Sequence, residues 1–250
     1  MDYELLARTR ASQIRGRLSL GDGPVNDIFK IIEGLGILLF KKPFDSKNLS
    51  GLFMKNNKNY IIVINSSKTL GHQIYSAAHE LSHYFFDKEL MGSICSISQS
   101  DNEKEILADK FAEHFLMPDE SVAQIVNKRI EEKGSIDEFD VLYLQNYFGV
   151  SWYAILVKLK KLQYINDINQ YLSIGVTKLT NMMGYDTTLI QPSNDVYVSK
   201  IYKEKALRCY RNYEISEKKL AEYLEAVDIK IQDIELDWDK EVNGGEYIGE

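Results

Sequence analysis

The chain has 250 residues, of which 44% are hydrophobic and 27% are charged, as in an ordinary folded protein of one large or two average domains. Its formal net charge of −7 gives no electrostatic case for binding nucleic acid, and its two cysteines cannot form a zinc-finger ligand set. No apolar run reaches the length of a membrane span and the first residues are not those of a signal peptide, so we expect a cytoplasmic protein.

The N-terminal part of the chain predicts two helices and then a sheet. Apolar residues recur at near-helical spacing over residues 2–19, and a second helix is expected from Val25 to Glu33, with Asn26 or Asp27 near its start. The expected strands are Ile37–Phe40, Leu52–Lys55 and Tyr60–Ile64, with a hairpin turn over residues 56–59. We expect these strands to form a small antiparallel sheet, which places the chain in the α+β class.

The stretch 71–87 follows directly and contains His79-Glu80-Leu81-Ser82-His83. Two histidines four residues apart on a helix lie on the same face, so both imidazoles can reach one metal ion. Glu80 is rotated by about 100° around the helix axis and can reach a metal-bound water instead. This is the pattern of zinc hydrolases, and the alternative is two structural histidines that happen to be four residues apart.

A catalytic zinc needs a third protein ligand. In the extended metzincin motif this ligand would follow as Gly and then His, but the chain has Phe86 and Glu89 at those positions, which excludes that class. The polar residues 88–102 predict a loop that borders the site or simply connects two helices.

A helix predicted over residues 103–116 offers the third ligand. Glu105 and Asp109 are four residues apart and therefore share one stripe of this helix, together with small and apolar residues that permit close packing. We expect Glu105 to bind one zinc ion, and Asp109 to accept a hydrogen bond from the non-ligating nitrogen of His79.

Other residues near this site are weaker candidates. Glu113 lies about 80° off the stripe and Glu103 about 160° off, so Glu113 is the fallback ligand. A solvated helix rich in Glu and Lys is the structural alternative. His114 falls on the opposite side of the helix and is expected to be a partner-bonded structural histidine. His72 lies two turns before His79, too far to share the metal, and is expected at the start of its helix or on the rim of the site.

The two segments HELSHYFF and EILADKFAEHFLMP resemble the ImmA/IrrE family of zinc metallopeptidases. The matching residues are His79, Glu80, His83, Glu105, Ala108, Asp109, Phe111, Ala112, Leu116, Met117 and Pro118. The resemblance extends over residues 1–165 and implies a thermolysin-like minimal peptidase core with one Zn2+ ion. Members of this family are often encoded beside helix-turn-helix repressors, and several cleave such a repressor and so switch on mobile-element or stress genes.

Residues 137–163 predict a helix, a turn and a second helix. Gly149 suits the turn and Ser151 suits an N-cap, and the pair resembles the helix-turn-helix that follows the peptidase part in the same family. The second helix begins with apolar and aromatic residues and its lysines come late, so direct DNA binding is not expected.

The rest of the chain predicts two more helices, Val196–Tyr210 and Ser216–Ala226, and an acidic tail. We therefore expect three parts. They are a zinc metallopeptidase domain at residues 1–133, a helix-turn-helix-like segment at 134–165 and a mostly helical region with an acidic tail at 166–250.

The expected function is a zinc-dependent endopeptidase that cleaves a specific regulatory protein, such as a helix-turn-helix repressor, and acts as an anti-repressor. His79, His83 and Glu105 are expected to bind the metal and Glu80 to act as the general base. One alternative is a module that sequesters a repressor or an antitoxin without cutting it. Another is a DNA-binding regulator. A membrane partner is not expected.

Overall fold

The computed structural model of the chain describes residues 2–46, 48–56, 59–87 and 102–233. It divides into two compact units, residues 1–197 and 198–250. The helices of the first unit are α1 (Tyr3–Arg17), α2 (Ile28–Gly34), α3 (Leu70–Phe86), α4 (Asn102–Leu116), α5 (Asp119–Lys133), α6 (Glu138–Phe148), α7 (Trp152–Lys161), α8 (Asn169–Leu172) and α9 (Val176–Met182), with a 3-10 turn at Thr188–Ile190. The strands are β1 (Leu38–Lys42), β2 (Gly51–Asn56), β3 (Asn59–Asn65) and β4 (Tyr197–Val198).

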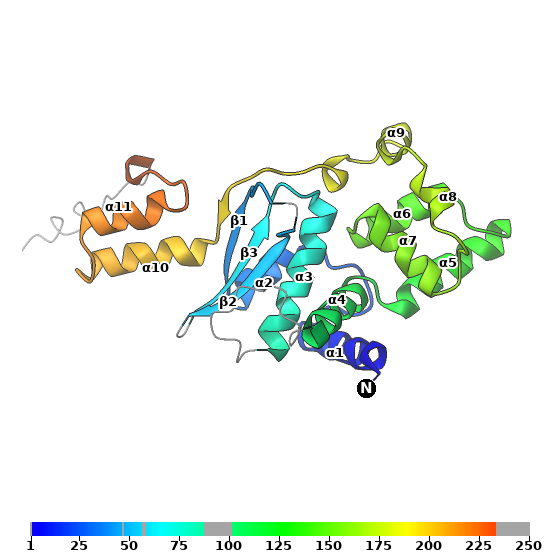
Figure 1. Cartoon of the computed structure of the whole chain (residues 1–250), viewed down its shortest axis with the longest axis horizontal. Helices are drawn as coiled ribbons and strands as arrows, with labels where there is room; N and C mark the ends of the chain where they lie inside the picture. Colours follow the sequence, from blue (N-terminus) through cyan, green and yellow to red (C-terminus); the bar gives the residue numbers. More distant parts are fainter. Residues whose placement is uncertain (1, 47, 57–58, 88–101, 234–250) are drawn as a thin grey trace, which may run out of the picture. The chain divides into compact units, whose positions relative to one another are not determined.

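The four strands form a mixed sheet in the order β2-β3-β1-β4 (Figure 1). β2 and β3 make the predicted antiparallel hairpin, in which Asn56 pairs with Asn59, while residues 57–58 lie outside the described residues. β1 runs parallel to β3, with Leu38 opposite Ile61. The α+β class is confirmed, but the prediction of an antiparallel sheet is wrong for this pair of strands.

The position of β3 explains the parallel pairing. β3 is a continuous apolar run and lies between β1 and β2, and its Ile62 and Ile64 are fully buried, as is usual for a central strand. β2 follows β1 in the chain but lies at the edge of the sheet, on the other side of β3. The connection from β1 to β2 is held by the buried side-chain amide of Asn65, which forms hydrogen bonds with the backbone of Phe44 and Leu49. β1 is therefore free to pair with β3 in the parallel direction.

Helix starts follow local capping chemistry. Asp27, Ser151 and Ser216 each accept a hydrogen bond from the backbone N–H three residues further on, which confirms the predicted caps. Gly149 ends α6 with a φ of 66°, a conformation that glycine adopts without strain, and this confirms the predicted turn. The two helices of the predicted helix-turn-helix-like segment therefore form, whereas a DNA-binding role for them stays a prediction.

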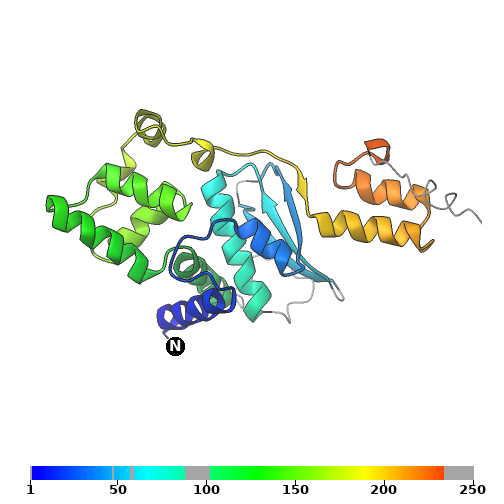
Figure 2. The same cartoon turned by 180° about the vertical axis from the view of Figure 1, so that it is seen from behind.

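The helices that matter for function lie beside the sheet. α2 and α3 both contact the strands, and α2 lies in front of them when the molecule is seen from behind (Figure 2). α4 packs between α3 and α1 (Figure 1). Both α3 and α4 bury apolar side chains in the core, among them Ala78 and Leu81 on α3 and Phe111 and Phe115 on α4. Burial of these side chains fixes which face of each helix is left for a site.

The second unit contains α10 (Lys200–Arg211), α11 (Glu217–Glu225) and a 3-10 turn at Ile231–Asp233. α10 begins later than predicted, because residues 197–198 extend into strand β4 instead of joining the helix. The acidic tail lies outside the described residues. None of the described helices is long and apolar enough to cross a membrane.

Candidate metal centre

α3 presents two imidazoles to one point. His79 and His83 are one turn apart, and their Nε2 atoms approach to 3.2 Å. His83 is fully buried and His79 is largely covered. Because Ala78 and Leu81 anchor the other side of α3 in the core, neither ring can turn away without disturbing the packing.

α4 adds a carboxylate to the same point. Glu105 Oε2 lies 3.1 Å from His79 Nε2, and Glu105 Oε1 lies 3.4 Å from His83 Nε2. One donor atom from each of these residues lies within 4.8 Å of the others. The three residues expected from the sequence to bind metal are thus brought together, and they form a His/Glu group that could hold a metal ion.

Two further carboxylates lie behind the imidazoles. Asp109 Oδ1 is 2.8 Å from His79 Nδ1, and Asp87 Oδ2 is 2.9 Å from His83 Nδ1. Each Nδ1 can therefore donate to a carboxylate, which leaves the Nε2 lone pair directed at the shared point. Asp109 lies where the sequence analysis expected it. Asp87 was missed, although its position four residues after His83, directly after the last residue of α3, was a usable signal.

Glu80 lies next to this group but is held by the sheet. Its side chain is 4% exposed, and the Phe53 backbone N–H of β2 donates a hydrogen bond to it. A Cβ added to Gly51 would lie 2.7 Å from Glu80 Oε1, so only glycine permits this close approach. Glu80 Oε2 is buried and has no hydrogen-bond partner among the described residues. A buried oxygen of this kind is unusual and marks a position where a further polar group belongs.

Burial and neighbouring charges shift the pKa values of Glu80 and His79. Burial raises the pKa of Glu80, and the nearby histidines only partly oppose this effect. Burial lowers the pKa of His79, but the hydrogen bonds to Asp109 and Glu105 outweigh it and raise the pKa to about 10. The carboxylates therefore favour positive charge at the shared point. A proton on His79 or a metal cation can supply it, and two imidazoles with one carboxylate are a donor set that suits zinc.

The rival ligands lie elsewhere. Glu113 Oε1 is 2.9 Å from Lys158 Nζ and 2.9 Å from Lys161 Nζ, so its charge is already matched by two lysines. Glu103 forms a hydrogen bond with Tyr3 on α1. Neither carboxylate belongs to the group formed by the two histidines.

Each of the two other described histidines has a hydrogen-bond partner, as expected for His114, and His72 lies at the start of its helix, as expected. His114 Nε2 lies 2.6 Å from Glu4 Oε1, and His114 is buried. Although Glu4, His114 and Glu113 also lie close together, lysines contact both carboxylates, which makes this an ion-pair network rather than a metal site. His72 is in the first turn of α3, and its Nε2 lies 2.9 Å from Ser50 Oγ.

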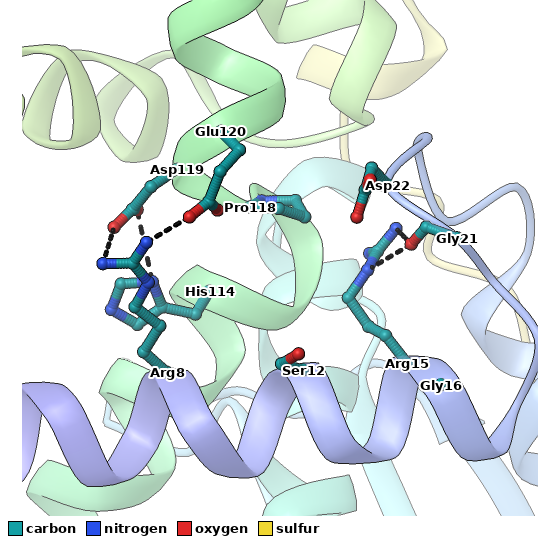
Figure 3. A pocket seen from close by; sticks show the side chains of 10 residues that line it. All are labelled: Arg8, Ser12, Arg15, Gly16, Gly21, Asp22, His114, Pro118, Asp119 and Glu120. Carbon is teal, nitrogen blue, oxygen red and sulfur yellow. Dashed lines mark hydrogen bonds and ion pairs between the residues drawn. The ribbon is translucent and has the colours of Figure 1, made fainter.

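A cavity of about 340 Å³ lies between α1 and the junction of α4 with α5, away from the metal centre (Figure 3). Its two arginines already have partners. Arg8 pairs with Glu120 and Asp119, and buried Arg15 donates to the backbone oxygens of Gly21 and Phe115. Both arginines are thus satisfied by the protein itself, so we assign them a structural role.

An α+β core that brings two histidines and a glutamate together beside a buried second glutamate is typical of metallopeptidase-type proteins. Residues 32–160 match the Peptidase M78 family model, described as the IrrE N-terminal-like domain, and the chain belongs to this family. The resemblance to the ImmA/IrrE family that the sequence predicts is thereby confirmed.

No curated protein matches the chain. Among solved structures, a Mycobacterium tuberculosis transcriptional regulator is similar, with 16% sequence identity and a TM-score of 0.39 over 64% of this chain and 47% of that one. The chain therefore spans less than half of the length of that protein.

Proposed function

We propose that the chain is a zinc-dependent endopeptidase. One observation carries this proposal: donor atoms of His79, His83 and Glu105 converge within 4.8 Å beside Glu80, whose buried Oε2 has no hydrogen-bond partner in the described part of the chain. Family membership supports the same chemistry, since metallopeptidases share this combination of residues. A purely structural ion-pair cluster would not leave a buried carboxylate oxygen unsatisfied.

His79, His83 and Glu105 would hold the zinc ion. When bound, zinc supplies a Lewis acid that polarises a peptide carbonyl and makes water a stronger acid. Asp109 and Asp87 hold the two imidazoles in the tautomer that directs Nε2 at the metal.

Glu80 would be the proton carrier of the reaction. Its carboxylate takes a proton from the attacking water at Oε2 and passes it to the leaving amine. Burial raises the pKa of Glu80, which makes the carboxylate a stronger base than an exposed glutamate. Its other contacts, with Gly51 and Phe53 of β2, keep it in place during both transfers.

The substrate would be an extended segment of a protein. β2 is an edge strand of the sheet and lies against Glu80. A peptide that pairs with β2 as a further strand would therefore pass across the metal centre. The family resemblance points to a helix-turn-helix repressor as the protein that is cut.

DNA recognition by α7 is the weaker alternative. Lys158 is fully buried and pairs with Glu113 and Asp119, so it is not offered to a phosphate. Trp152 and Ile155, near the start of the helix, are also buried, although a recognition helix reads bases with residues in that region.

The test uses the full chain, metal analysis and a Glu80→Gln variant. We expect about one zinc per chain in wild type and variant, and truncation of a repressor encoded beside the gene by the wild type alone. A variant that relieves repression as well as wild type would show that sequestration is the function. A chain without zinc, after purification without chelators, would contradict the proposal.

A further inference from the structure

A second cavity, of about 260 Å³, continues the metal centre along α3 and α4. Taking about 100° per residue, His72, Tyr75, His79 and His83 fall within about 80° of one another on α3. The cavity is lined by His72 and Tyr75, so it lies along the same face as the metal-site histidines, toward the start of α3. Four to seven residues correspond to about 6–10 Å along a helix.

α4 and the residue that follows it also line the cavity, through Asp109, Glu113 and Met117. Asp109 is the residue that the cavity shares with the metal centre, because its Oδ1 lies 2.8 Å from His79 Nδ1. The Tyr75 hydroxyl donates to the backbone oxygen of Asp109 at 2.8 Å, which ties the two helices together at the cavity. The cavity therefore borders the metal centre, with Asp109 between the two.

α7 forms the remaining wall. Tyr153, Ala154 and Val157 line the cavity from the first two turns of this helix. The wall is fixed in place, because a Cβ added to Gly71 on α3 would lie 2.8 Å from the backbone nitrogen of Ser151. Tyr153 is 59% exposed, so it lines the cavity at its solvent side.

The lining of the cavity favours an uncharged, apolar group as its ligand. Met117, Ala154 and Val157 offer apolar surface. Glu113 also lines the cavity, but its carboxylate lies 2.9 Å from both Lys158 Nζ and Lys161 Nζ, and Asp109 already bonds His79. Each acidic side chain among the described residues that line the cavity thus already has a lysine or histidine partner. A volume of about 260 Å³ is below the range of drug-sized ligand pockets and leaves room for a large side chain.

We propose that this cavity receives an apolar side chain of the substrate, two or three residues from the bond that is cut. An extended peptide advances about 3.3 Å per residue, so such a side chain reaches a point 6–10 Å from the metal centre. α7 is then a specificity wall of the peptidase. That the bound side chain belongs to a substrate rests on the proposed function, but the affinity of the cavity for apolar side chains does not.

The first experiment needs neither zinc nor turnover. Methyl-labelled methionine in the full chain, with the Met117 signal assigned through Met117→Leu, is titrated with the N-acetyl amides of leucine, alanine and lysine. We expect the leucine amide to shift the Met117 signal in a saturable way, and the alanine amide to require at least tenfold higher concentration. A lysine amide that binds as well as leucine, or a Met117 signal that no amide moves, would overturn the proposal.

The second experiment places the cavity beside the metal centre. Three hydroxamates that differ only in an isobutyl, methyl or aminobutyl side chain are bound to the zinc-loaded chain and measured by calorimetry. Burial of three more carbons predicts that the isobutyl compound binds roughly tenfold tighter than the methyl compound, or better. Ala154→Phe fills the cavity and should abolish this preference, and Tyr153→Ala should weaken it severalfold.

A matched control is Ala123→Phe, since Ala123 is a half-exposed alanine on α5 outside the cavity. It should keep the full preference for the isobutyl side chain. A preference that survives Ala154→Phe would overturn the proposal. If the chain binds these probes as expected but cleaves no peptide, the proposed hydrolysis fails while the side-chain site stands.

Discussion

At the residue scale, the close approach of Gly51 to Glu80 predicts a dependence of turnover on a glycine outside the metal site. The added Cβ of Gly51→Ala would lie 2.7 Å from Glu80 Oε1 and 3.0 Å from its Cγ, so the carboxylate must move. A displacement of about 1 Å in a reacting group can cost roughly 10²-fold in kcat. We expect a loss of that size with the zinc content unchanged, measured by steady-state cleavage of a peptide substrate.

A double-mutant cycle separates this effect from general damage. Glu80→Asp shortens the side chain by one methylene and makes room for the added methyl, so Gly51→Ala should cost less in the Glu80→Asp background than in wild type. Gly16→Ala on α1, where no atom lies within 4 Å of the added Cβ, is the control and should keep wild-type turnover. Strict additivity of the two substitutions would argue against the contact.

Asp87 gives a second prediction at this scale. It accepts from His83 as Asp109 accepts from His79, at 2.9 and 2.8 Å. Loss of such a partner lowers metal affinity about 10–100-fold, so we expect Asp87→Ala to raise the zinc dissociation constant by this factor. Competition with a chromogenic chelator measures the change. Asp167→Ala, at an exposed aspartate outside the site, should leave the constant unaltered.

Most residues of this site can be predicted from the sequence. The spacing on one helix identifies His79, Glu80 and His83, and the spacing on a second helix identifies Glu105 and Asp109, because residues within one helix have a fixed angular relation. The contact of Glu80 with Gly51 could not be predicted in this way. It depends on how β2 packs against α3, and no spacing along the chain encodes that distance.

At the element scale, the strands of the sheet can be predicted from the sequence, but the direction of one of them cannot. Apolar alternation and the hairpin residues locate β2 and β3, but the direction of β1 depends on which strand it pairs with. β3 is buried and central and accepts a parallel neighbour, and the Asn65 side chain stabilises the connection that makes this order possible. Such a link between residue 65 and residues 44–49 is a tertiary contact and leaves no periodic signal.

α7 is anchored by a buried amine, and this predicts a large loss of stability in Lys158→Met. Lys158 is fully buried and pairs with Glu113 at 2.9 Å and with Asp119. Removal of the buried amine leaves Glu113 with Lys161 and Asp119 with Arg8, which are both more exposed. We therefore expect a loss at the lower end of the range for a broken buried ion pair, about 3 kcal/mol in the free energy of unfolding. Urea denaturation followed by circular dichroism measures it.

The neighbouring Lys160 is exposed on the same helix and supplies the control for this substitution. Lys160→Met should change the free energy of unfolding by no more than about 0.5 kcal/mol. An equal effect of both substitutions would mean that helix propensity or surface charge, and not the buried pair, sets the stability of α7.

At the scale of the whole molecule, two separate hydrophobic cores correspond to the two compact units. One core joins the sheet with α1 to α7 and reaches as far as Leu179, and the other is centred on Ala206, Leu220 and Leu224. The metal centre, Glu80 and the apolar cavity all lie within residues 1–197. The proposed chemistry therefore needs no side chain of the second unit.

The stability of this first unit should fall with acidification through Glu4, which joins α1 to α4 and α7. Burial alone would raise its pKa, but bonds from Lys110, Lys161 and His114 lower it from 4.5 to about 2. A carboxyl group with a depressed pKa in the folded state stabilises the protein above its unfolded pKa, and this contribution disappears as the pH falls from 4.5 toward 2. We expect Glu4→Gln to be less stable than wild type at pH 7, with the difference shrinking near pH 3. Urea midpoints at both pH values measure this difference in stability.

Glu132→Gln, at an exposed glutamate of α5, is the control, and its stability should not converge with that of wild type in acid. A loss of stability in Glu4→Gln that is constant or larger in acid would exclude Glu4 as the group responsible.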